Sequence, residues 1–120
     1  MTKIQVVEDT PLNMELLLEL IEAQGFEVDG AEDAKLALEK VEKNAYDLII
    51  MDIELPGMNG VEAARIIKKK PEYRTVPIIA QTAYAMKGDK EKFIEAGFDE
   101  YVSKLIDVPD FMKLLEKFRK

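Results

Sequence analysis

The feature that most constrains the fold of this chain is a regular alternation between short apolar runs, rich in β-branched residues, and longer amphipathic segments. Strands that alternate with helical segments of about 10–15 residues build βαβ units and a parallel sheet. The run at residues 48–51 is apolar on both faces, as expected for a central parallel strand. The pattern predicts an α/β protein of five β/α units, with strands at residues 4–7, 27–31, 48–51, 78–82 and 100–103.

The expected helices carry recognisable signals at their ends. The first begins at Pro11, which suits the first helical position, and Asp9 or Thr10 is a candidate cap. It ends before Gly25, a residue type common just past a helix end. The other helices are expected at residues 33–44, 61–70, 87–96 and 109–120. On the first helix, the spacing predicts one broad apolar stripe of Leu12, Leu16, Leu17, Leu20 and Ile21.

The composition suits a single domain over residues 1–120. The chain is 48% hydrophobic, and a domain of this size buries a sizeable core without a disulfide or metal. It has no cysteine and no histidine, which excludes thiol catalysis and also imidazole as a base, zinc ligand or phosphocarrier. No apolar run approaches the roughly 20 residues that span a bilayer, and the N-terminus lacks the apolar stretch of a signal peptide. We therefore expect a cytoplasmic protein without a membrane partner.

The charge of the chain is distributed unevenly. The net charge is −7, and residues 1–60 contain 14 acidic and only 4 basic residues. Such acidity argues against direct binding to nucleic acid. It favours a cation site in the first half of the chain, although an ordinary solvated acidic surface accounts for the same numbers.

Polar side chains follow four of the five expected strands. Glu8 and Asp9 follow the first strand, Asp52 follows the third, Thr82 ends the fourth and Lys104 follows the fifth. In an open parallel sheet, ligands bind beyond the carboxyl ends of the strands, so we expect these side chains to share one crevice. A single Asp after a strand is more often a helix cap, but five matched positions at the ends of four strands are hard to ascribe to capping.

The chemistry of this group points to phosphoryl transfer. Three clustered carboxylates raise one another's pKa unless a cation neutralises them. With oxygen ligands only, the candidate ions are Mg²⁺, Mn²⁺ and Ca²⁺, and Mg²⁺ is the natural choice when a phosphate completes the octahedron. One carboxylate can then attack phosphorus and form an acyl phosphate. Lys104 would offset charge on the phosphoryl oxygens, and Thr82 could donate a hydrogen bond to one of them.

The chain resembles bacterial response-regulator receivers over its whole length, most clearly in residues 6–9, 47–60, 77–83 and 97–104. The resemblance implies a doubly wound (βα)5 fold with the flavodoxin-like strand order 2-1-3-4-5. Asn13, Tyr84 and Met86 are similar to residues of small single-domain cell-cycle regulators and of receivers joined to hybrid kinases. The resemblance also implies the site roles, with Asp52 as phosphoacceptor and Lys104 as the phosphate-binding lysine. It implies that Asp9 binds Mg²⁺ directly, Glu8 mostly through water and Glu54 through its backbone carbonyl. Thr82 and Tyr101 would be the switch pair.

The implied function is that of a two-component or phosphorelay response regulator. A histidine kinase or a His-containing phosphotransfer protein would supply the phosphoryl group, because this chain has no histidine of its own. Phosphorylation would add a multivalent anion that can draw in Thr82, and Tyr101 could then rotate into the vacated space. Alternatively, Tyr101 is a packed aromatic residue of an edge strand whose hydroxyl reaches solvent. The resulting change in the surface of the fourth helix, fifth strand and fifth helix would alter binding to a downstream protein. We expect a monomer or weak dimer that is not an enzyme acting on external substrates.

One position departs from the family pattern. Receivers usually have Lys-Pro at the end of the fifth strand, often with a cis peptide, whereas this chain has Lys104-Leu105. A cis bond before a non-proline residue costs about 2.5–4 kcal/mol, so we expect a trans bond here. Lys104 would then reach the phosphate less well, unless neighbouring residues absorb the change.

Two other functions are compatible with the same residues. The first is a scaffold that binds partners but is never phosphorylated. The second is a Mg²⁺-dependent phosphatase with an Asp nucleophile. Such enzymes generally carry another Asp two residues past the nucleophile, where this chain has Glu54, and they have cap segments that this chain lacks. Glu54 flanks the site and could tune access to it.

Overall fold

The structure is a computed structural model that describes residues 2–83 and 89–119. Its centre is a five-stranded sheet in the order β2-β1-β3-β4-β5, with every neighbouring pair parallel. This confirms the doubly wound α/β class, and the strand bounds agree with the expected ones to within one residue. The strands are β1 (Lys3–Val7), β2 (Glu27–Ala31), β3 (Leu48–Asp52), β4 (Ile78–Thr82) and β5 (Glu100–Ser103).

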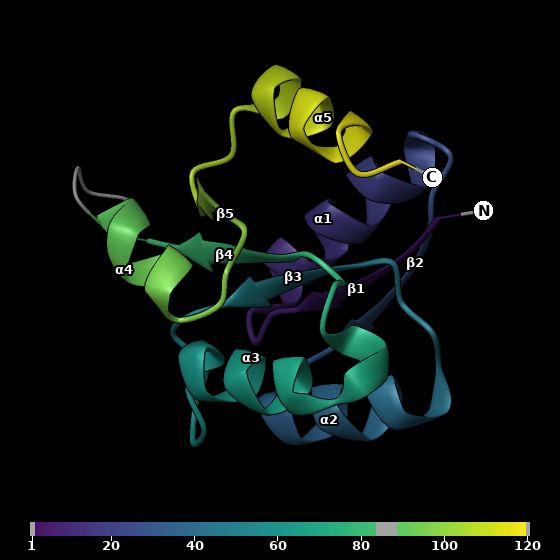
Figure 1. Cartoon of the computed structure of the whole chain (residues 1–120). Coiled ribbons are helices and arrows are strands. Elements are labelled where there is room, and N and C mark those ends of the chain that lie inside the picture. Colours follow the sequence, from purple (N-terminus) through teal and green to yellow (C-terminus); the bar gives the residue numbers. More distant parts are fainter. Residues whose placement is uncertain (1, 84–88, 120) are drawn as a thin grey trace.

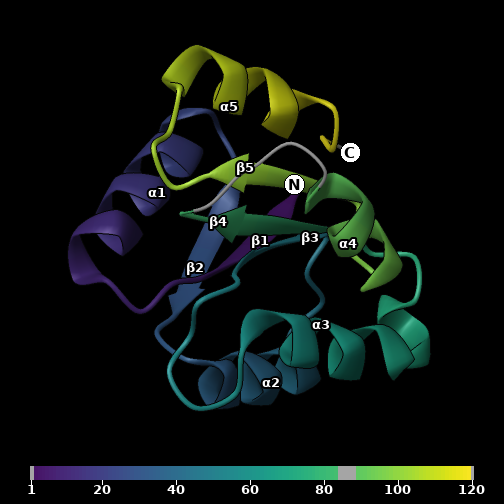
Figure 2. The same cartoon turned by 90° about the vertical axis from the view of Figure 1, so that its left-hand side faces the viewer.

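The helices cover both faces of the sheet, which makes three layers (Figures 1 and 2). Helices α1 (Pro11–Ala23) and α5 (Val108–Glu116) lie on one face, and α2 (Ala34–Lys43) and α3 (Gly60–Lys69) on the other. Helix α4 (Asp89–Glu95) lies beside the edge strand β5. None of the helices in the described part of the chain is long and apolar enough to cross a membrane.

The first helix differs from its expectation in two respects. Thr10 occupies the N-cap position, but its side chain makes no capping hydrogen bond. The apolar stripe is also narrower than predicted, because Leu12 is 78% exposed and Leu16 is 42% exposed, whereas Leu17 and Ile21 are fully buried. Residues 12 and 16 form one row along the helix and residues 17 and 21 the next, and only the second row faces the sheet.

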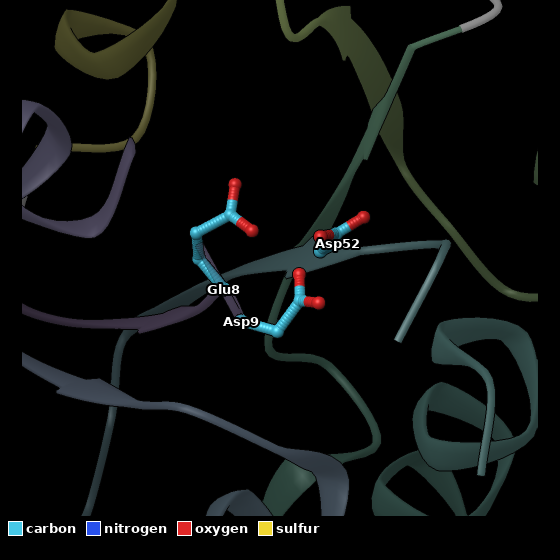
Figure 3. Close-up of side chains that lie close together, drawn as sticks. All are labelled: Glu8, Asp9 and Asp52. Carbon is cyan, nitrogen blue, oxygen red and sulfur yellow. The ribbon is translucent and has the colours of Figure 1, made fainter. Parts of the chain in front are cut away.

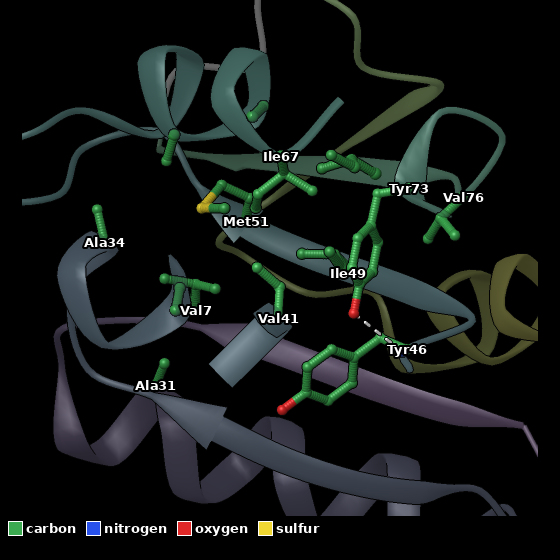
Figure 4. Close-up of a cluster of buried hydrophobic side chains, with 14 of the residues drawn as sticks. Val7, Ala31, Ala34, Val41, Tyr46, Ile49, Met51, Ile67, Tyr73 and Val76 are labelled. Atoms are coloured by element: carbon green, nitrogen blue, oxygen red, sulfur yellow. Dashed lines mark hydrogen bonds between the residues drawn. The ribbon is translucent and has the colours of Figure 1, made fainter. Parts of the chain in front are cut away.

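Two hydrophobic clusters fill the spaces on either side of the sheet. Strand β3 contributes to both, because all five of its residues are buried, as predicted for a central strand. Figure 4 shows the cluster on the α2–α3 side, where the Tyr73 ring enters from a short 3-10 helix, η1 (Pro71–Tyr73), which was not expected from the sequence. The Tyr73 hydroxyl accepts a hydrogen bond from the Tyr46 N–H at 3.3 Å and donates one to the Asn44 carbonyl at 2.6 Å. The sheet is thus packed on both faces, and the candidate site lies at its carboxyl edge.

Candidate functional site

Three carboxylates meet at the carboxyl edge of the sheet. Each of Glu8, Asp9 and Asp52 offers one oxygen, and these oxygens all lie within 4.8 Å of one another. Figure 3 shows the three side chains gathered where β1 and β3 end. Glu8 and Asp52 are buried, with 1% and 0% of their surface exposed, whereas Asp9 is exposed. The structure therefore brings together the three acids that the sequence predicted as a cluster.

Strand register explains this meeting. Strands β1 and β3 are parallel neighbours in which Val7 lies opposite Met51, so the next residues along each strand, Glu8 and Asp52, emerge side by side. Both oxygens of Glu8 are held: the Asn13 side-chain amide donates to Oε1 and the Thr10 N–H donates to Oε2, each at 3.2 Å. Asn13 was singled out from the sequence only as a family likeness, and its structural contact is with the acidic cluster.

The loop after β3 is also held close to Asp52. The Glu54 N–H donates to Asp52 Oδ1 at 2.9 Å, and the Gly60 N–H donates to the Ile53 carbonyl at 3.1 Å. A Cβ atom at Gly60 would clash with the Asp52 backbone oxygen, so a residue with a side chain cannot stand there without a shift of the backbone. Gly60 therefore lets α3 begin directly against the strand that carries Asp52.

Lys104 reaches the cluster from β5. Its Nζ atom lies 2.9 Å from Asp52 Oδ2 and 3.3 Å from Glu54 Oε2. The described residues contain no cis peptide bond, so the bond between Lys104 and Leu105 is trans, as expected. The Leu105 N–H, which a proline would lack, donates to Ser103 Oγ at 3.1 Å. Lys104 thus reaches Asp52 despite the departure from Lys-Pro, and the Leu105 side chain is 90% exposed.

Glu54 enters the site with its side chain as well as its backbone. Its Oε1 atom accepts hydrogen bonds from the Thr82 hydroxyl and the Ala83 N–H, both at 3.2 Å, and Oε2 faces Lys104. From the sequence, only the backbone carbonyl of Glu54 was expected as a ligand, and its side chain was expected to flank the site and tune access to it. The contacts of the side chain depend on how the β3–α3 loop turns back over β4, which periodicity and motif spacing do not specify.

Tyr101 packs against helix α4. It is half-buried on β5 opposite Ala80, and its ring centroid lies 5.7 Å from that of Phe93 on α4. Thr82, the other residue of the expected switch pair, is buried at the end of β4. Tyr84 and Met86, which the sequence singled out as family likenesses, lie outside the described residues.

Comparison with known proteins identifies the family. The sequence matches the family model described as response regulator receiver domain over residues 4–116. The chain belongs to this family. It is 42% identical over 119 residues to the polar-differentiation response regulator DivK of Brucella ovis, and the match covers 98% of this chain and 97% of that protein. A receiver of this kind is a signalling phosphoacceptor of a two-component system, and the similarity to DivK confirms the expected likeness to small cell-cycle regulators.

Solved structures of other receivers have the same fold. The chemotaxis response regulator CheY4 of Vibrio cholerae matches with a TM-score of 0.92 at 25% identity, over 99% of both chains. TrrA of Thermotoga maritima, solved in complex with Mg²⁺–BeF, matches with a TM-score of 0.87 at 37% identity, over 99% of this chain and 100% of that one. The receiver domain of a Pseudomonas aeruginosa sensor histidine kinase, solved with magnesium in its active-site cleft, gives a TM-score of 0.88 at 33% identity, over 98% and 96% of the two chains.

The electrostatics of this receiver's site are dominated by buried negative charge. Burial, reinforced by the neighbouring Glu8, raises the pKa of Asp52 to about 7, against the opposing influence of Lys104. For Lys104, burial acts to lower the pKa, but contacts with Asp52, Glu8 and Glu54 outweigh it and the pKa is raised. One ammonium group is therefore shared among several carboxylates, and the site has an excess of negative charge that a cation can offset.

The donor set fits a hard divalent cation. All the side-chain donors of the cluster are carboxylate oxygens, the ligand type that Mg²⁺ and Ca²⁺ prefer. Asp52 Oδ2 is buried and accepts no well-directed hydrogen bond from the described part of the chain, although it lies close to Lys104. A buried carboxylate oxygen with this free capacity can take a further positively charged partner.

Proposed function

We propose that residues 1–120 form one receiver domain in which Asp52 accepts a phosphoryl group from a phosphohistidine on a histidine kinase or phosphotransfer protein. The observation that carries the proposal is the placement of the Asp52 carboxylate, fully buried at the carboxyl edge of the sheet between the two acids that follow β1 and the ammonium of Lys104. A buried carboxylate with a cationic neighbour and a raised pKa is typical of a reactive group rather than of a surface ion pair.

The transfer that we propose is a displacement at phosphorus. An Asp52 carboxylate oxygen forms the new P–O bond while the P–N bond to the donor imidazole breaks, and the bonding electron pair leaves with the imidazole nitrogen. Lys104 contacts the reacting carboxylate and would offset charge on the transferred phosphoryl oxygens. The Thr82 hydroxyl, which donates to the same Glu54 carboxylate that Lys104 faces, would donate to one of these oxygens. The donor imidazole comes from another molecule, because this chain has no histidine.

We further propose that Asp9, Asp52, Glu8 (through water) and the backbone carbonyl of Glu54 hold Mg²⁺, for which Mn²⁺ or Ca²⁺ can substitute. When bound, the ion supplies positive charge that offsets the carboxylates and the incoming phosphoryl group. The all-oxygen donor set and the free capacity of Asp52 Oδ2 support this assignment. So do the related receivers that were solved with Mg²⁺–BeF or with magnesium in the cleft.

The proposed output is a change in the surface formed by α4, β5 and α5. Thr82 would move toward the phosphoryl group, and Tyr101 would turn toward the space that it leaves. A groove of about 360 Å³ lies on the β5–α5 part of this surface, and the half-buried Tyr101 forms part of its wall. A downstream protein that binds here would sense the position of Tyr101. The other lining residues include Leu105, Ile106, Phe111 and Leu114.

The decisive experiment is to incubate the protein with Mg²⁺ and either acetyl phosphate or a phosphorylated histidine kinase. We expect an adduct that is stable in acid, labile in base, and lost in Asp52→Asn. Absence of an adduct with every donor would favour a scaffold that is never phosphorylated. Rapid turnover of external phosphate esters would favour a phosphatase instead.

A further inference from the structure

The Glu54 side chain engages three donors at the carboxyl edge of the sheet. Its Oε1 atom accepts from the Thr82 hydroxyl and the Ala83 N–H, at 3.2 Å each, and Oε2 lies 3.3 Å from Lys104 Nζ. The donors come from the end of β4, from the residue after it and from the end of β5. These three donors form a small anion-binding site, here called the cradle, and the Glu54 carboxylate occupies it.

The cradle and the proposed phosphoacceptor share Lys104. The same Nζ atom that faces Glu54 lies 2.9 Å from Asp52 Oδ2, so the cradle opens directly onto the Asp52 carboxylate. A phosphoryl group on Asp52 would place its oxygens toward these donors. A hydroxyl and a backbone N–H each have one hydrogen to give, so Thr82 and Ala83 cannot bond Glu54 and a phosphoryl oxygen fully at the same time.

Glu54 has room to leave the cradle. Its side chain is 37% exposed, whereas Asp52 is fully buried, so rotation about the Glu54 side-chain bonds can carry the carboxylate into solvent. Its backbone is anchored separately, through the N–H that donates to Asp52 Oδ1. The carboxylate can therefore move without displacing the backbone carbonyl that is proposed to bind Mg²⁺.

We propose that the Glu54 carboxylate occupies the cradle in the unphosphorylated protein and competes there with the phosphodonor. The carboxylate must swing out before Asp52 is phosphorylated. This inference rests on the proposed function of Asp52. If only a fraction of molecules have an open cradle, the apparent affinity for any phosphoryl-like anion is reduced by that fraction. Glu54 is thus a positioning residue that sets the rate of phosphorylation rather than a group that reacts.

The test compares Glu54→Ala and Glu54→Asp with the unaltered protein. The rate constant for phosphorylation by acetyl phosphate is measured by intact-protein mass spectrometry with Mg²⁺ in excess, and the affinity for beryllofluoride by ¹⁹F NMR. We expect Glu54→Ala to raise both by roughly tenfold, the effect of an open fraction near one tenth. Glu54→Asp keeps the charge but is one methylene shorter, so we expect most of the same gain.

A matched control is Glu42→Ala, which removes the same charge and breaks an ion pair to Lys70 of 2.8 Å on a distant surface. It should leave both quantities unchanged. If Glu54→Asp behaves like the unaltered protein while Glu54→Ala is faster, charge repulsion and not occupancy is at work, and the inference is wrong. Equal or slower phosphorylation in Glu54→Ala overturns it while leaving Asp52 as phosphoacceptor. No adduct in any variant overturns both proposals.

Discussion

Lys104 Nζ lies 2.9 Å from Asp52 Oδ2, and this contact joins the ends of β5 and β3 across the intervening strand β4. Asp52 is fully buried and the Lys104 side chain is only 20% exposed, so the pair is largely removed from water. An ion pair in such surroundings is screened less than one on the surface. The charge state of Asp52 is therefore coupled to the position of β5, the strand that carries Tyr101.

Lys104→Ala tests this coupling. We expect phosphorylation by acetyl phosphate to fall on the order of a hundredfold, because the positive charge nearest the reacting carboxylate is lost. We also expect a lower thermal midpoint at pH 8, because Asp52 is left as a buried charge without its ammonium partner. Lys70→Ala, which breaks the exposed pair with Glu42, serves as the control and should change neither quantity appreciably. An unaltered rate in Lys104→Ala would argue against a role for this lysine in transfer.

Asp52→Asn should make the thermal stability of the metal-free protein less dependent on pH. The pKa of Asp52 is about 7 in the folded protein against an ordinary value of 3.8, so the folded state holds a proton that the unfolded state has released between these values. The stability that this proton contributes is fully present below pH 3.8 and is lost as the pH rises through 7. We expect Asp52→Asn to gain thermal stability relative to the unaltered protein between pH 5.5 and 8, by about 5 °C or more at the upper end. A constant difference across this range would contradict the raised pKa.

Divalent cations should restore much of the stability that the protein loses when Asp52 is ionised. We expect Mg²⁺ to raise the thermal midpoint of the unaltered protein at pH 8, since an ion that binds only the folded state stabilises it by mass action. Asp9→Asn should abolish most of the increase, because Asp9 is the exposed member of the carboxylate cluster and is proposed to bind the ion directly. Glu72→Gln changes an exposed acid on η1 far from the cluster, and its response to Mg²⁺ should match that of the unaltered protein.

Leu105→Pro introduces the Lys-Pro sequence that the family resemblance led us to expect at this position. It removes the N–H that donates to Ser103 Oγ, and it makes a cis bond after Lys104 far less costly. We expect altered phosphorylation kinetics or altered affinity for the partner. Leu105→Ala keeps the N–H and removes only the exposed apolar side chain, so it separates the effect of the backbone from that of the surface. Unchanged kinetics and unchanged binding in Leu105→Pro would show that the departure is neutral.

Gly60→Ala tests the close packing between the start of α3 and the end of β3, which carries Asp52. A Cβ there would clash with the Asp52 carbonyl oxygen, and relief of that clash requires α3 to move away from the end of β3. We expect a loss of about 2 kcal/mol in the free energy of unfolding, measured by urea denaturation, and slower phosphorylation. Glu62→Ala, an exposed change in the same helix, should leave both nearly unaltered.

Much of the fold and of the candidate site followed from the sequence alone. The alternation of apolar runs and amphipathic segments is a local pattern, and it determined the five strands because a parallel sheet covered on both faces requires it. The acids at residues 8, 9 and 52 could be placed together for a related reason. The carboxyl ends of parallel strands emerge at one edge, so residues that directly follow the strands meet there whatever the loops do.

Only the tertiary structure decided the features that depend on how separate elements pack. Leu12 and Leu16 belong to an apolar helix pattern, yet they are exposed because α1 packs on the sheet through the neighbouring row, Leu17 and Ile21. The Glu54 side chain accepts hydrogen bonds from Thr82 and Ala83. These residues are far from Glu54 in the sequence, and the loop after β3 brings them together. Such contacts depend on loop direction and side-chain rotamer, and neither has a period along the chain that could reveal it.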